Sequence, residues 1–60
     1  MKLVTFKKGG EQGEVAINPA QITHVRDAPG SLTDIYFGQH RVVVGGTFAQ
    51  VVRRLMGEEP

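Results

Sequence analysis

Cysteine is absent from this chain, so neither a disulfide bond nor a thiolate metal site stabilises it. Only two histidines are present, too few for a structural zinc site without cysteine ligands. The chain has 60 residues and forms one domain, and a domain of this size buries only about 60% of its unfolded surface. Because such a core is marginal, we expect copies of the chain to share a core in a homo-oligomer.

Neither sign of charge dominates, and no long apolar run occurs. Seven basic and six acidic residues give a net charge of +1, whereas a chain that neutralises phosphates usually has a clear basic excess. No apolar stretch approaches the roughly 18 residues of a membrane span. The apolar part of residues 1–8 is too short for a secretory signal. These absences predict a cytoplasmic protein without membrane insertion, and they weigh against a dedicated nucleic-acid binder without excluding one.

Short β-prone segments alternate with turn residues along the first half of the chain. Three such segments are predicted strands: 3–6, 14–17 and 22–26. Asn18 and Pro19 break the chain after the second strand, because proline fixes its own φ and keeps the preceding residue out of the helical region. Residues 27–31 contain Pro29 and Gly30, a strong turn signal after the third strand.

Residues 32–37 and 40–44 predict a hairpin. Gly38 and Gln39 suit a type II′ turn, in which glycine takes the first central position. That turn pairs Phe37 with His40 and fixes which side chains share a face. The predicted core face carries Ile35, Phe37, Val42 and Val44. The opposite face carries Leu32, Asp34, Tyr36, Arg41 and Val43.

A capped amphipathic helix is predicted from Thr47, whose hydroxyl and the Gln50 side chain form a capping box. One apolar stripe follows at helical spacing: Phe48, Val51, Val52 and Leu55. Gly57 fits the end of the helix, and residues 58–60 are expected to form a frayed tail. The expected β+α fold is a small curved antiparallel sheet or partial barrel of about five short strands, with one C-terminal helix packed on it. Residues 1–57 form the single domain.

Several short motifs follow one another along the chain: the Asn-Pro step in 15–19, Ile22 and Val25, and segments 33–35, 42–44 and 48–55. Their order resembles the FlbD-like family of small flagellar proteins. The resemblance implies a small strand-rich fold closed by a short helix, no catalysis, and a protein partner in flagellar assembly or the motor. The chain departs from the family pattern mainly at surface positions, such as the turn at 27–31.

No residues point to catalysis, a cofactor or a metal. Thr5 and Ser31 have no base at a recognisable spacing, so we expect a protein that is not an enzyme. His24, Asp27 and His40 are interpreted as separate surface residues, because a metal site needs several ligands in a defined geometry.

Two glycine pairs are candidate anion sites. Lys7 and Lys8 precede the first pair, but no helix follows it as in a phosphate-binding loop. Gly45 and Gly46 directly precede a helix, whose amino end favours anions. We interpret the first pair as a solvated turn and the second as a corner that lets the helix fold back over the sheet.

The outward hairpin face is the predicted partner-binding surface: Leu32, Asp34, Tyr36, Arg41 and Val43. Tyrosine and arginine are typical interface anchors, and charged groups at the rim set the register of docking. This favours a small binding or adaptor module that contacts itself and another protein. The alternative is a small-barrel nucleic-acid binder of phage or mobile-element origin, using a basic aromatic surface made by Arg26, Arg41, Arg53, Arg54 and Tyr36.

Overall fold

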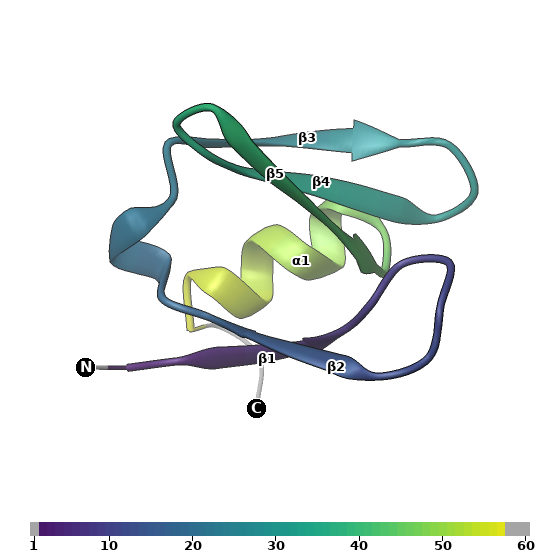
Figure 1. Ribbon diagram of the computed structural model, residues 1–60, viewed down its shortest axis with the longest axis horizontal. Helices are drawn as coiled ribbons and strands as arrows, with labels where there is room; N and C mark the ends of the chain where they lie inside the picture. Colours follow the sequence, from purple (N-terminus) through teal and green to yellow (C-terminus); the bar gives the residue numbers. More distant parts are fainter. Residues whose placement is uncertain (1, 58–60) are drawn as a thin grey trace.

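The computed structural model describes residues 2–57, which form five β-strands, a 3₁₀ turn and one α-helix (Figure 1). The elements are β1 (Val4–Lys7), β2 (Glu14–Ile17), the 3₁₀ turn (Pro19–Gln21), β3 (His24–Ala28), β4 (Leu32–Phe37), β5 (His40–Gly45) and α1 (Phe48–Leu55). The predicted β+α class, with about five antiparallel strands and a C-terminal helix, is confirmed. Within residues 2–57, no helix combines the length and the apolar character needed to cross a membrane.

The strands form two antiparallel sheets that do not close into a barrel. β1 pairs with β2, while β4 lies between β3 and β5. A single bridge between Lys8 and Val44 joins the sheets, next to a hydrogen bond of 2.9 Å from the Gly9 amide to the Val43 carbonyl. In Figure 1, α1 lies between the two sheets. The expected curved layer is therefore two sheets joined at one corner, with the helix in the space between them.

The predicted β4–β5 hairpin is confirmed in register and turn. Ile35 pairs with Val42 and Phe37 with His40. Gly38 has a φ of 66° and Gln39 does not share a positive φ, as a type II′ turn requires. The core of the molecule is made by side chains from both sheets and the helix: Phe6, Ile17, Ile35, Val44 and Val51.

The predicted bounds of three strands were wrong. The fifth strand differs least, since β5 extends one residue further than expected, to Gly45. β1 begins one residue later than expected and ends at Lys7, which pairs with Glu14. β3 begins at His24 and continues through Asp27 and Ala28, which the turn prediction had included. The turn is shorter because pairing of these two residues with β4 outweighs their preference for turns.

Both ends of α1 match the sequence prediction. The Gln50 amide donates to the Thr47 hydroxyl over 3.3 Å, and the Thr47 amide donates to Gln50 Oε1 over 3.0 Å. Gly57 has a φ of 79° and its amide donates to the Arg54 carbonyl over 3.1 Å, so glycine ends the helix without steric cost. The predicted tail at 58–60 lies outside the described residues.

The helix is rotated relative to the predicted stripe. Val51 is buried against the core, and the Arg54 guanidinium carbon lies 5.3 Å from the centre of the Phe6 ring. Successive residues are about 100° apart around a helix. With Val51 facing the core, Phe48 and Val52 therefore lie to one side of the buried face of α1. Phe48 is 44% exposed, so the prediction that it lies in the buried stripe was wrong. The reason is that the arginine, rather than the phenylalanine, covers the β1 side of the core.

A buried hydroxyl fixes the corner between the sheet and the helix. Thr33 is fully buried on the core face of β4, and its hydroxyl donates to the Gly46 carbonyl over 3.0 Å. The Gly46 amide in turn donates to the Ser31 carbonyl over 2.9 Å. These two bonds hold the glycine corner against the start of β4, which sets where α1 begins.

Candidate functional site

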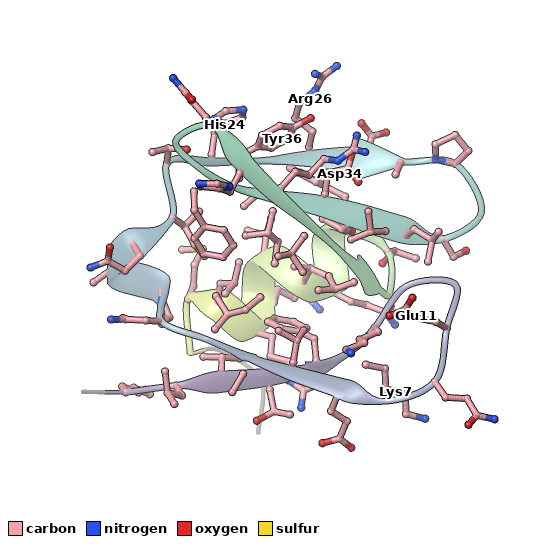
Figure 2. All side chains as sticks on the ribbon, viewed as in Figure 1. Lys7, Glu11, His24, Arg26, Asp34 and Tyr36 are labelled. Atoms are coloured by element: carbon pink, nitrogen blue, oxygen red, sulfur yellow. The ribbon has the colours of Figure 1, made fainter. Side chains whose placement is uncertain are left out.

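The face of the three-stranded sheet that points away from α1 has three side-chain positions on each strand. The register places them in rows across β3, β4 and β5. We define the outer face by these residues: His24, Arg26, Ala28, Leu32, Asp34, Tyr36, Arg41, Val43 and Gly45. All five predicted partner-binding residues lie on it. Figure 2 shows His24, Arg26, Asp34 and Tyr36 projecting together from this side of the sheet.

An aromatic stack forms the first row of the outer face. The His24 and Tyr36 rings are parallel within 12°, with their centres 4.3 Å apart. Arg41 pairs with Tyr36 from the other side, on β5. Tyr36 is half-buried between these neighbours, while His24 and Arg41 are exposed. The row therefore presents one imidazole plane and one guanidinium to solvent, with the tyrosine as their support.

Thr23 positions this row, although it precedes β3. Its hydroxyl donates to the Tyr36 carbonyl over 3.1 Å and accepts the Gly38 amide over 3.1 Å. The Thr23 amide also donates to the Tyr36 carbonyl, over 2.9 Å. The hydroxyl oxygen lies 3.3 Å from His24 Nδ1. One side chain thus joins the start of β3 to the β4–β5 turn and holds the imidazole beside the tyrosine.

A carboxylate occupies the middle of the outer face. Asp34 Oδ2 lies 3.8 Å from an Arg41 guanidinium nitrogen, and the side chains are 16% and 56% exposed respectively. Arg26 pairs with Asp34 from β3. An exposed ion pair of this kind stabilises by about 0–1 kcal/mol, so it contributes more to charge pattern than to folding. Two arginines around one acid leave the outer face with an excess of positive charge.

The chain itself covers the far corner of the outer face. A Cβ atom added to Gly9 would lie 2.6 Å from Val43 Cγ1 and 3.2 Å from Leu32 Cδ2. The Gly9 backbone thus lies directly on these two side chains, and only glycine fits there without a shift. Leu32 and Val43 are half-buried as a result. The open part of the outer face is the area around Tyr36 and Asp34.

Sequence reasoning missed His24, Arg26 and Thr23 as parts of this surface. His24 was interpreted as an isolated surface histidine, and Arg26 was assigned only to the nucleic-acid alternative. Counting back from the Pro29–Gly30 turn pairs Ala28 with Leu32 and then His24 with Tyr36. A shift of two residues along a strand leaves each side chain on the same face, so these residues were missed because the third strand was not paired with the fourth.

The other candidate residues do not assemble into a site. His40 pairs with Phe37 and so belongs to the opposite face of the sheet from His24. Among residues 2–57, no three His, Cys, Asp or Glu side chains lie close enough to hold a metal ion. The amides of the candidate anion site at Gly45 and Gly46 are used internally, because the Gly46 amide donates to the Ser31 carbonyl and the Thr47 amide donates to Gln50 Oε1.

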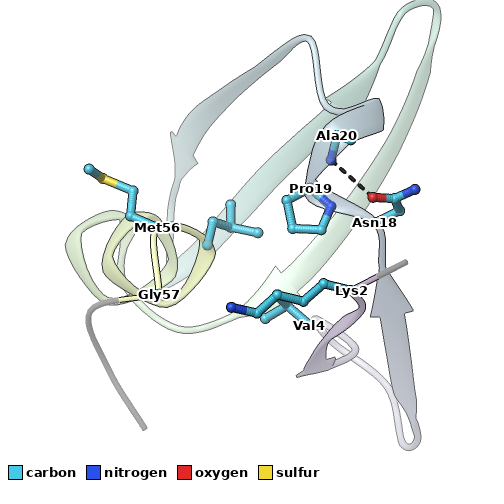
Figure 3. A pocket seen from close by; sticks show the side chains of 8 residues that line it. Lys2, Val4, Asn18, Pro19, Ala20, Met56 and Gly57 are labelled. Atoms are coloured by element: carbon cyan, nitrogen blue, oxygen red, sulfur yellow. Dashed lines mark hydrogen bonds between the residues drawn. The ribbon is translucent and has the colours of Figure 1, made fainter.

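A separate open hollow of about 400 Å³ lies between β1, the 3₁₀ turn and the end of α1 (Figure 3). Val4, Pro19 and Leu55 are among its lining residues. The Asn18 side chain beside it already accepts the Ala20 amide over 3.0 Å, as an N-cap. The lining is mainly apolar and does not bring together the polar groups that would fix one ligand.

The chain was compared with protein-family models, curated proteins and solved structures, and none of the three comparisons found a match.

Proposed function

We propose that this chain is a small, non-enzymatic adaptor module that self-associates and binds a protein partner through the outer face. The observation that carries the proposal is the grouping of His24, Tyr36 and Arg41 in one row beside the half-buried Asp34. Tyrosine and arginine supply most of the binding energy at many protein interfaces. Here Tyr36 is stacked against His24 before a partner arrives, which lowers the entropy cost of binding.

The charge pattern defines the partner's chemistry. Arg26 and Arg41 flank Asp34, so a complementary surface carries carboxylates opposite the arginines and a hydrogen-bond donor opposite the aspartate. A polyphosphate backbone supplies negative charge opposite the arginines, but it offers no hydrogen-bond donor to Asp34. The Asp34 carboxylate repels it. The protein partner is therefore an acidic surface that also has at least one donor.

One observation favours the alternative function, binding of single-stranded nucleic acid. The His24 ring is exposed on top of Tyr36 and has Arg26 next to it on the same face of β3. A base stacked on such a platform gains about 1–3 kcal/mol, and the arginine contacts phosphate. The net charge of +1 and the central carboxylate make this the weaker proposal.

The resemblance to FlbD-like proteins supports a flagellar role, with a partner in flagellar assembly or the motor and a location in the cytoplasm. The resemblance rests on short sequence motifs, whereas the adaptor proposal rests on the geometry of the outer face. The two are therefore separable: the face can bind a protein partner whether or not that partner is flagellar.

A photo-crosslinking residue at position 39 tests the adaptor function, because Gln39 is exposed in the turn beside Tyr36 and Arg41. In the host cell, we expect a crosslinked protein of one reproducible mass that disappears when Arg26→Glu is added. A crosslinker at the exposed Glu14 on β2 is the matched control and should not trap that protein. Equal trapping from both positions, or trapping unaffected by Arg26→Glu, would contradict the proposal.

The alternative is tested with a fluorescent oligothymidine strand. Under the adaptor proposal, purified protein shows no saturable binding at physiological salt. Tight binding that weakens steeply with salt and is lost in Arg41→Ala would favour the nucleic-acid function instead.

A further inference from the structure

β3 is an edge strand with an open side. Within residues 2–57 its ladder partner is β4, so the backbone groups on its other side have no strand beside them. The second edge of this sheet, β5, is bridged at Val44 to Lys8, whereas β2 is an edge of the two-stranded sheet with β1. An open edge is a template for pairing with another chain. What distinguishes β3 from β2 is the helix surface next to it.

The rotation of α1 places an apolar strip on the β3 side. Arg54 faces β1, where it covers Phe6. The opposite flank of the helix carries Phe48, Val52 and Met56, spaced four residues apart and therefore aligned along the helix. Phe48 and Met56 are 44% and 66% exposed, and Val52 is half-buried. The helix packs against β3 and β4. Figure 3 shows the Met56 side chain pointing away from Val4 and Pro19, and so away from β1 and the 3₁₀ turn.

We propose that two copies of this chain associate through the β3 edge and this helix strip. The strip is self-complementary under a two-fold axis, since Val52 is its midpoint. When the two-fold axis passes through Val52, the Val52 side chains of the two copies face each other. Phe48 of each copy then faces the partner's Met56. A closed two-fold dimer is the commonest arrangement of identical chains, and it satisfies the open edge and the exposed strip together.

The alternation of side chains along β3 selects the register. Antiparallel neighbours on one face must match outer-face residues with outer-face residues. A register centred on Arg26 sets two arginines against each other, which is destabilising. A register centred on Val25 sets that valine against its equivalent and places Asp27 opposite the partner's Thr23. The second register therefore has the lower electrostatic cost.

This inference rests on the proposed self-association and names the surface that produces it. Pairing of two β3 edges makes one six-stranded sheet, because each copy contributes β3, β4 and β5. The two outer faces then lie on one side of a single sheet. The dimer is a bivalent adaptor whose two binding faces are held in a fixed relation.

Light scattering over a range of concentrations measures the association. We expect the wild type to reach twice its 6.5 kDa chain mass and Val52→Lys to remain a monomer with an unchanged circular-dichroism spectrum. Ala16→Lys adds the same charge at an exposed position on β2 and should remain dimeric. A wild-type monomer at all concentrations, or a dimer indifferent to Val52→Lys, would overturn the inference. So would a dimer that is lost in Tyr36→Ala and kept in Val52→Lys.

A second test uses the absence of cysteine from the chain. Val52→Cys should form an intermolecular disulfide rapidly under mild oxidation, whereas Ala16→Cys should form it slowly, and equal rates would contradict the proposed axis. Crosslinking from position 39 in the Val52→Lys background separates this inference from the adaptor function. Trapping that persists in the monomeric Val52→Lys chain agrees with both proposals. A wild-type chain that is monomeric but still traps the partner contradicts only the inference, and a wild-type dimer that traps nothing contradicts only partner binding by the outer face.

Discussion

The two faces of β4 have opposite properties although their residues alternate along one six-residue strand. Thr33 and Ile35 point inward and are fully buried, whereas Asp34 and Tyr36 point outward and remain half-exposed. The inward residues hold the helix corner and fill the core. The outward residues carry charge and an aromatic stack. Stability and recognition are therefore separated by side-chain direction within a single strand, so each can change without the other.

Ile35→Ala should produce the largest effect, on the inward face. Removing a fully buried isoleucine side chain to alanine typically costs about 2–5 kcal/mol, which approaches the whole stability of a small domain. We expect the variant to be largely unfolded by circular dichroism at 25 °C. A cooperative transition within about 1 kcal/mol of wild type would show that the Ile35 side chain does not carry the core.

Thr33→Val should cost about 1–3 kcal/mol, since it keeps the shape of the side chain and removes the donor to the Gly46 carbonyl. Urea unfolding followed by circular dichroism measures the difference. Thr5→Val is the control, because Thr5 is exposed on β1 and its change should stay within about 0.5 kcal/mol. Equal effects of the two substitutions would mean that the glycine corner does not depend on the buried hydroxyl.

Tyr36→Ala should lower stability by about 1 kcal/mol, because it removes the stack with His24 while leaving the core intact. Crosslinking from position 39 should nevertheless be abolished. Tyr36→Phe keeps the ring and should keep most of the trapping, which makes it the matched variant. A loss of stability in Tyr36→Ala as large as that in Ile35→Ala would contradict the separation of stability and recognition between the two faces of β4.

Asp34→Asn should have the smallest effect on folding, at most about 1 kcal/mol, since its ion pair with Arg41 is partly exposed. The difference in unfolding free energy should shrink further as salt is added. Crosslinking of the acidic partner should be retained, because the arginines remain. Strengthened binding to oligothymidine in this variant would instead point to phosphate recognition.

The sequence predicted those parts of the fold in which neighbouring residues determine conformation. Glycine at position 38 specified the hairpin turn and with it the β4–β5 register, and Thr47 with Gln50 specified the helix start. The third strand was misplaced because Asp27 and Ala28 resemble turn residues locally and are paired only through β4.

The candidate site was predicted in part for the same reason. The outward residues of β4 and β5 followed from the hairpin register, while His24 and Arg26 depended on the pairing of β3 with β4, which was not predicted. The exposure of Phe48 was also missed, because a hydrophobic pattern does not show that Arg54 covers the ring of Phe6. Contacts between distant segments decided each of these differences.

The single bridge between Lys8 and Val44 has a consequence for how the molecule opens. The β1–β2 unit is tied to the rest by few backbone bonds, so it is expected to swing outward as one body about this hinge. Such an opening would expose Phe6 and Ile17 to solvent. The three-stranded sheet and the buried Thr33 would stay intact. Amide hydrogen exchange should therefore be faster across residues 4–17 than across residues 33–44. Protection from exchange should increase from the β1–β2 unit to the central strands.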